Sequence, residues 1–73
     1  MANHIAQIHV SIPNSLAGEV LGELNRLGGT VTGIQQEAES RTRIDESMPA
    51  ANVATFKAWL MHFSGGQGHV SDS

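Results

Sequence analysis

A chain of 73 residues has room for one small domain, which excludes a complete multidomain enzyme. Because the chain contains no cysteine, a disulfide framework, a thiolate metal cage and a cysteine nucleophile are also excluded. The formal net charge of -3, from four basic and seven acidic residues, disfavours autonomous binding to a nucleic-acid phosphate backbone.

Alternating hydrophobic residues predict a first strand over residues 5–12, with Ile8, Val10 and Ile12 on its buried face. Pro13 cannot donate a backbone hydrogen bond and should end this strand. A helix is predicted over residues 15–27, with Asn14 or Ser15 as its N-cap. Its apolar face is expected to consist of Leu16, Val20, Leu21, Leu24 and Leu27.

Two glycines, Gly28 and Gly29, favour a turn into a second strand over residues 30–37. This strand is poorly patterned, because Val31 and Ile34 have opposite parity along it. We therefore expect it at an edge of the sheet, followed by a connection over residues 37–40.

A third strand is predicted from the alternation of Thr42, Ile44, Glu46 and Met48, which share one face. Glu46 is anomalous on that face, because a buried carboxylate without a partner is costly. A bulge, or a sheet end that reaches water, is expected to expose it.

A second helix is predicted over residues 51–64, after Pro49, with Trp59 flanking its apolar stripe. The stripe is expected to contain Val53, Phe56, Leu60 and Phe63. The glycine-rich run that follows leaves room for a short last strand within residues 68–73. The order β-α-β-β-α-β predicts an α+β fold, the ferredoxin-like sandwich, with both helices on one face of an antiparallel sheet and residues 1–73 as one domain.

The polar residues show no catalytic or metal-binding pattern, so we predict no enzyme activity and no metal site. The four histidines are expected on the surface: His4, His9, His62 and His69. His9 and His69 could be neighbours on adjacent strands. The glycine-rich run over residues 65–68 follows a helix and has no lysine, unlike a phosphate loop.

Gly18 and Gly22 lie four residues apart inside the first helix and away from its leucine-rich face. Each costs about 1 kcal/mol relative to alanine. Two explanations remain open: close approach by another backbone, or tolerance on an exposed face.

The chain resembles the C-terminal domain of elongation factor G and of the related tetracycline ribosomal-protection proteins. Residues 5–13, IAQIHVSIP, and residues 18–28, GEVLGELNRLG, are similar to the family patterns V-x-V-x-x-P and G-D-V-I-G-D-L-N-x-R-x-G. The sequence Met48-Pro49-Ala50 and the helix after it are similar to the family segment that begins V-P-L. The similarity covers nearly the whole chain.

The resemblance implies a non-catalytic, ferredoxin-like domain that docks on the large ribosomal subunit, at rRNA and the stalk-base protein. It also implies that GTP and magnesium bind only to another domain of a parent translation factor. We therefore expect a cytoplasmic, monomeric chain with no cofactor of its own. No apolar run in the sequence approaches the roughly 20 residues of a membrane span.

Candidate ribosome contacts follow from exposure, motif position and analogy with this family. They are Gly18, Gly22, Asn25 and Arg26 on the first helix, and Trp59, Met61, His62, Gly66 and Gln67 around the second. Met61 and Gln67 stand where the family has basic residues, which predicts weaker contact with rRNA phosphates.

Two alternatives use the same fold. A small-molecule regulatory module resembling the ACT domain would bind an amino acid at residues 15–18, the loop after the first strand. An acylphosphatase-like enzyme would need an arginine beside a glycine loop there, and residues 13–16 supply none.

Overall fold

The computed structural model describes residues 4–72, which form four strands, two α-helices and two short 3-10 turns. The elements in chain order are β1 (Ile5–Pro13), a 3-10 turn (Asn14–Leu16), α1 (Ala17–Arg26), β2 (Thr30–Ala38), β3 (Arg41–Pro49), a second 3-10 turn (Ala50–Asn52), α2 (Val53–Ser64) and β4 (His69–Asp72).

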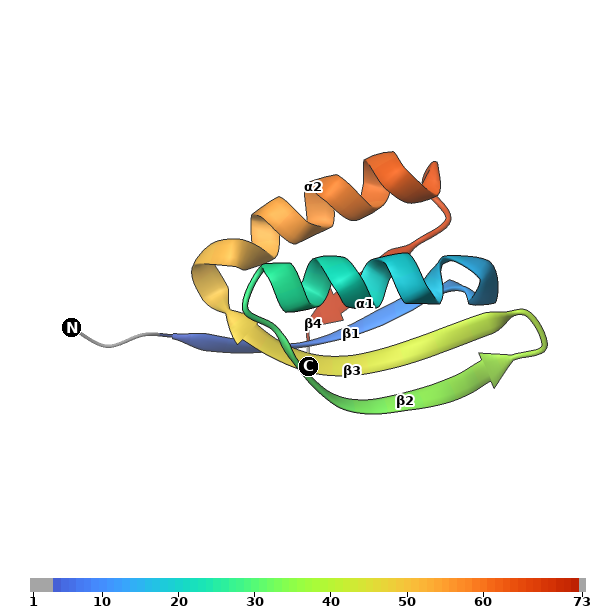
Figure 1. Ribbon diagram of the computed structural model, residues 1–73, viewed down its shortest axis with the longest axis horizontal. Helices are drawn as coiled ribbons and strands as arrows, with labels where there is room; N and C mark the ends of the chain where they lie inside the picture. The colour runs from blue at the N-terminus through green and yellow to red at the C-terminus, as the bar shows by residue number, and fades with distance from the viewer. Residues whose placement is uncertain (1–3, 73) are drawn as a thin grey trace.

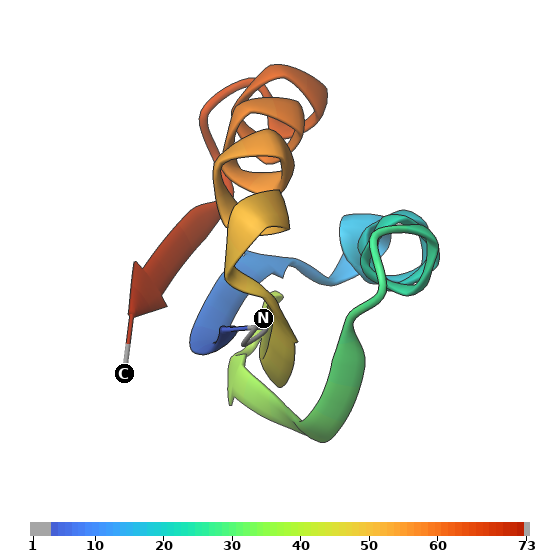
Figure 2. The same cartoon turned by 90° about the vertical axis from the view of Figure 1, so that its left-hand side faces the viewer.

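The four strands form one antiparallel sheet in the order β2-β3-β1-β4, with both helices on one face (Figures 1 and 2). The predicted ferredoxin-like α+β fold is therefore confirmed. The central strands β1 and β3 pair over their full nine residues, from Ile5 opposite Pro49 to Pro13 opposite Arg41. The edge position predicted for β2 is also confirmed, and the short β4 forms the opposite edge.

The core lies between the helices and the inner sheet face. It consists of Ile8, Val10, Ile12, Val20, Leu24, Ile44, Met48, Phe56 and Leu60. The period-two residues of β1 and β3 and the helical stripes of α1 and α2 meet there, as the sequence predicted. Burial of these apolar side chains is the main driving force for folding.

A β-bulge explains the irregular pattern of β2. Val31 lies opposite Glu46 and Gly33 lies opposite Asp45, so Thr32 is an extra residue in the ladder. This extra residue restores the parity between Val31 and Ile34. Both side chains consequently lie on the helix side of the sheet, although they remain 38% and 54% exposed.

The prediction that Phe63 belongs to the core is wrong, because its side chain is 39% exposed. The last turn of α2 directs Ser64 inward instead, where Ser64 Oγ accepts a hydrogen bond of 2.9 Å from the Gly68 N–H. Phe63 lies on the flank of the helix and stacks on Trp59.

The start of the first helix also differs from the prediction. A 3-10 turn precedes α1, and neither Asn14 nor Ser15 caps it with a side chain. Asn14 instead accepts a hydrogen bond of 2.6 Å from the Thr42 hydroxyl, which ties the end of β1 to the start of β3. The predicted connection over residues 37–40 is shorter than expected, because β2 continues to Ala38.

Glu46 is not exposed by a bulge or by the end of the sheet, as the sequence had predicted. Its side chain is 1% exposed, and the bulge lies on the neighbouring strand β2. Neither carboxylate oxygen has a hydrogen-bond partner among the described residues. Burial therefore raises the pKa of Glu46 to about 7.

Candidate functional surface

The outer face of α1 carries the first group of sequence-predicted contacts. Gly18 and Gly22 face open space, because a Cβ atom built on either meets nothing within 4 Å. Asn25 and Arg26 are also exposed on this helix. Arg26 donates hydrogen bonds to Glu23, three residues earlier, which lowers the pKa of that carboxyl. This ion pair neutralises Arg26, and the exposed Glu19 leaves α1 with a formal net charge of -1.

The open space at Gly18 and Gly22 gives a first prediction. We expect Gly22→Ala, and equally Gly18→Ala, to raise the free energy of unfolding by about 0.5–1 kcal/mol, because alanine lowers the entropy cost of helix formation. Chemical denaturation would measure this gain. A loss of stability in either variant would show that the glycine has a packing role within the domain itself.

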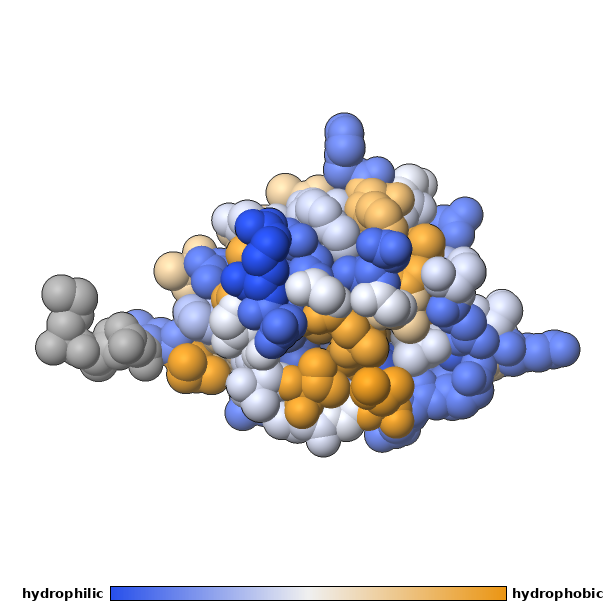
Figure 3. All heavy atoms as spheres, in the orientation of Figure 1, coloured by the Kyte–Doolittle hydropathy of each residue, from blue (hydrophilic) through white to orange (hydrophobic). Residues whose placement is uncertain are grey.

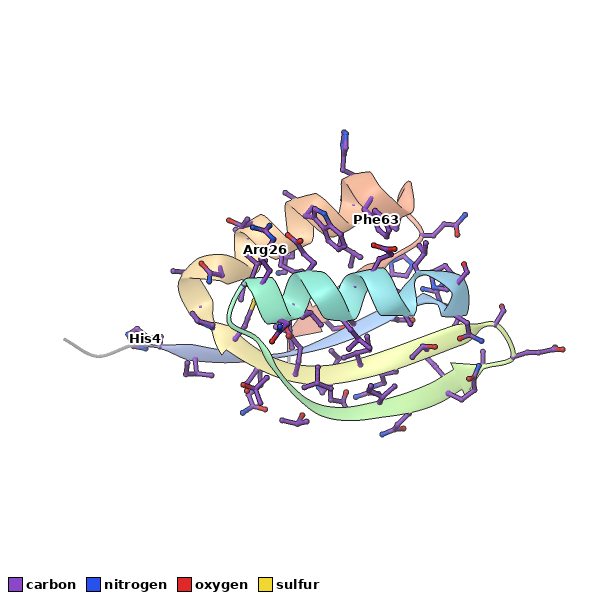
Figure 4. The ribbon with its side chains drawn as sticks, viewed as in Figure 1. His4, Arg26 and Phe63 are labelled. Carbon is purple, nitrogen blue, oxygen red and sulfur yellow. The ribbon has the colours of Figure 1, made fainter. Side chains whose placement is uncertain are left out.

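The aromatic side chains of α2 form a stack along the helix. Trp59 and Phe63 lie nearly parallel, with ring centroids 4.7 Å apart and an interplanar angle of 9°. Phe56 extends the stack into the core, 6.0 Å from Trp59. Met61 is 69% exposed on the same helix, which makes it the most exposed of the large apolar side chains described. Figure 4 shows Phe63 near the end of α2 and Arg26 at the end of α1.

The loop after α2 holds the remaining predicted contacts. Gly65 and Gly66 adopt positive φ angles of 64° and 88°, which glycine tolerates readily. Gly66 and Gln67 are exposed, but the loop is anchored, because the Arg41 guanidinium donates a hydrogen bond of 2.8 Å to the Gln67 carbonyl. Arg41 also donates to the Ser11 carbonyl at 2.9 Å, so it joins this loop to β1.

The structure thus places all nine predicted contacts outside the buried core. Eight are exposed, and Trp59 is half-buried. The two groups lie on separate helices of the helical layer and do not converge on one cavity among the described residues. This arrangement is a broad surface for hydrogen bonding and apolar contact.

A polar network on the outer sheet face was missed by the sequence analysis. His9 Nδ1 lies 2.6 Å from Asp45 Oδ1, and Arg43 Nε donates to the same oxygen at 3.0 Å. These two hydrogen bonds lower the pKa of Asp45. The alternation along the strands predicts that all three side chains lie on the outer face of the sheet. It does not predict which residues of β1 and β3 lie opposite each other, so the contact between His9 and Asp45 could not be predicted. His69 lies on β4 opposite Ser11, diagonal to His9.

The surface of the described residues has a hollow beside this network and another at the loop end. One of about 90 Å³ lies on the outer sheet face and is lined by His9, Val10, Ser11, Glu37, Arg43 and Ser71. A shallower one of about 410 Å³ lies at the loop end and is lined by Pro13, Asn14, Ser15, Ser40, Arg41 and Gln67. Gly18, the glycine on which the amino-acid-binding alternative depends, does not line either hollow.

Within residues 4–72, no group of three histidine, aspartate or glutamate side chains could hold a metal ion. No helix in this part of the chain is long and apolar enough to cross a membrane.

Comparison with known proteins gives consistent results. Residues 5–72 match the family model described as elongation factor G C-terminus. An elongation factor G-like protein of Thermotoga maritima is 25% identical over 67 residues, which cover 92% of this chain and 10% of that protein. A crystal structure of a protein from Thermus thermophilus superposes with a TM-score of 0.81 and 26% identity, over 97% of this chain and 11% of that one. The chain therefore spans about a tenth of the length of these relatives.

Proposed function

Since the chain belongs to the family of elongation factor G C-terminal domains, we propose that it is a non-catalytic domain that docks a translation factor on the large ribosomal subunit. The observation that carries this proposal is the family match over residues 5–72, together with the matching fold. The docking role itself rests on the resemblance to elongation factor G.

The proposed docking surface is the helical layer. Its apolar part consists of the exposed edge of the stack formed by Trp59 and Phe63 and, on the other flank of α2, the exposed Met61. Aromatic and methionine side chains of this kind are common in the central part of protein interfaces. The only basic residue of α1, Arg26, is paired with Glu23, and Glu19 adds an exposed acidic group, so contact with a ribosomal protein should contribute more than contact with rRNA phosphates.

The proposal assigns no cofactor to this chain. GTP and magnesium would bind to another domain of a parent factor, and the site of action would be the cytoplasm. The amino-acid-binding alternative gains no support from the family match, and Gly18 lies on the exposed face of α1 rather than in a binding loop.

Co-sedimentation of the 73-residue chain with purified large ribosomal subunits, over a salt series, tests the proposal. We expect saturable binding that weakens with salt and is displaced by elongation factor G. Met61→Glu should weaken binding several-fold, because it replaces the most exposed large apolar side chain described in the helical layer by a charge. Gln35→Glu, which adds the same charge to an exposed position of β2, should bind normally.

Two results would contradict the proposal. Absence of binding at low salt would exclude docking by this chain, and equal binding of the two variants would exclude the helical layer as the docking surface. Arg26→Ala adds a quantitative check. If Arg26 contacts an rRNA phosphate, its loss should reduce the slope of log affinity against log salt concentration by about 1, whereas loss of a contact to protein should leave that slope unchanged.

A further inference from the structure

The two methionines that the structure describes lie in opposite environments. Met48 belongs to the core and is 1% exposed, whereas Met61 on α2 is 69% exposed. The third methionine, Met1, lies outside the described residues. An oxidant dissolved in water reaches the thioether of an exposed methionine much more easily than that of a buried one. The fold therefore leaves Met61 open to oxidation and shields Met48.

The neighbours of Met61 along α2 leave its side chain uncovered. Gly65, one turn later, has no side chain, and a Cβ atom built on it meets nothing within 4 Å. Ala58, one turn earlier, is exposed and carries only a methyl group. Water and small solutes can consequently approach the thioether of Met61 along this flank of the helix.

Met61 also contributes a large share of the apolar surface of the helices. Figure 3 shows the strongly hydrophobic side chains of one face gathered below α1, whereas the surface over α2 is mostly polar or only weakly hydrophobic. Of the large apolar side chains that are exposed within residues 4–72, only Met61 and Phe63 belong to a helix. A change that makes Met61 polar would therefore remove much of the apolar character of the helical layer.

We propose that Met61 is a site of reversible oxidation by hydrogen peroxide, and that the resulting sulfoxide weakens docking of this chain. The effect on docking rests on the function proposed above. The sulfur lone pair attacks one peroxide oxygen, so that an S–O bond forms and the O–O bond breaks. The departing hydroxide takes the proton of the transferred oxygen and leaves as water. Sulfur thereby loses two electrons to the peroxide.

The sulfoxide is polar, whereas the thioether is apolar, which explains the expected loss of contact with a protein partner. Methionine sulfoxide reductases reverse the reaction with two electrons from a dithiol, and release the oxygen as water. The exposure of Met61 that admits the oxidant also admits such a reductase.

Mass spectrometry after limited treatment of the chain with hydrogen peroxide tests the site without ribosomes. Trypsin cleaves after lysine and arginine, which places the three methionines on three different peptides, residues 1–26, 44–57 and 58–73. We expect Met61 to gain one oxygen at least about tenfold faster than Met48, because of its exposure. Fragment masses distinguish Met61 from Trp59 on the same peptide. Equal rates for the two methionines, or oxygen on Trp59 alone, would overturn the proposal.

Co-sedimentation with large ribosomal subunits measures the effect of oxidation on binding. The oxidised chain should bind about threefold or more weakly than the untreated chain, and treatment with the reductases should restore binding. The loss should be smaller than that caused by Met61→Glu, because a sulfoxide carries no net charge. Met61→Leu is the matched control: it is apolar and similar in size but has no sulfur, so it should bind normally before and after peroxide.

These measurements separate failure of this inference from failure of docking. If the untreated chain does not bind, the docking proposal is wrong, and the oxidation rates still decide whether Met61 is the oxidised site. If the untreated chain binds and the oxidised chain binds equally well, the effect on docking is refuted. An equal loss of binding in the peroxide-treated Met61→Leu variant would refute it too, because oxidation would then act elsewhere. Urea denaturation should show unchanged stability after oxidation, since Met61 lies outside the core; a loss would mean that oxidation acts on the fold.

Discussion

Replacing Glu46 with glutamine is expected to raise the free energy of unfolding by about 3 kcal/mol at pH 8 and by less than about 1 kcal/mol at pH 5. The reason is the burial of an unpartnered carboxyl group, whose pKa is raised from its ordinary value of 4.5 to about 7. Between these two values the folded protein keeps a proton that the unfolded chain releases. The stability contributed by protonated Glu46 is therefore complete below about pH 4.5, falls as the pH rises, and is lost above about pH 7.

The surroundings of Glu46 explain why ionisation is costly there. Its neighbours across the sheet are Ile8 on β1 and Val31 on β2, and Gly29 lies against one of its carboxylate oxygens. None of these residues provides a cation or a side-chain donor. An effect of about 3 kcal/mol is large for a domain of this size, whose total stability is typically about 4–10 kcal/mol.

Urea denaturation of the two proteins at pH 5, 6.5 and 8 would measure this effect. The four histidines are common to both, so the difference between them isolates Glu46. Glu19→Gln, at an exposed position of α1, is the control and should follow the unmodified chain at every pH. Parallel stability curves for the chain and its Glu46→Gln variant would show that Glu46 ionises normally in the folded state.

The sequence was sufficient to predict the order of strands and helices, because hydrophobic residues in each half of the chain repeat every second residue in the strands and at helical spacing in the helix. Ile8, Val10 and Ile12 repeat every second residue, and Val20 and Leu24 recur at helical spacing. The mixed parity of β2 even identified an edge strand. The position of its bulge at Thr32 could not be predicted, since a bulge is defined by the partner strand.

The features that the sequence did not predict depend on contacts between elements that are distant in the sequence. The alternation of residues along β3 placed Glu46 on the inner face of the sheet. The cost of burying a carboxylate then favoured an exposed side chain. In the structure the side chain is buried and lies against Gly29. Helical spacing assigned Phe63 to the core, although Ser64 takes the inward position at the last turn of α2. The contacts proposed for the ribosome came from the family resemblance, and the structure shows only that they are outside the core.

Gly29→Ala is expected to lower the free energy of unfolding by about 2–3 kcal/mol, the second largest effect after that of Glu46. A Cβ atom at this position would lie 2.6 Å from Glu46 Oε2 and 2.9 Å from the backbone oxygen of Leu24. The carboxylate is the end of a flexible side chain, but it is buried. The Leu24 oxygen cannot move away easily, because it accepts a 2.7 Å hydrogen bond from the Gly29 N–H.

Gly22→Ala is the matched control for this substitution, since it introduces the same methyl group into open space on α1. The two variants should change stability in opposite directions, which thermal or chemical denaturation would measure side by side. Adding Gly29→Ala to the Glu46→Gln variant should remain costly, because the contact with the Leu24 backbone persists. A harmless Gly29→Ala would mean that the connection between α1 and β2 can move away from β3, and Glu46 would then be able to reach water.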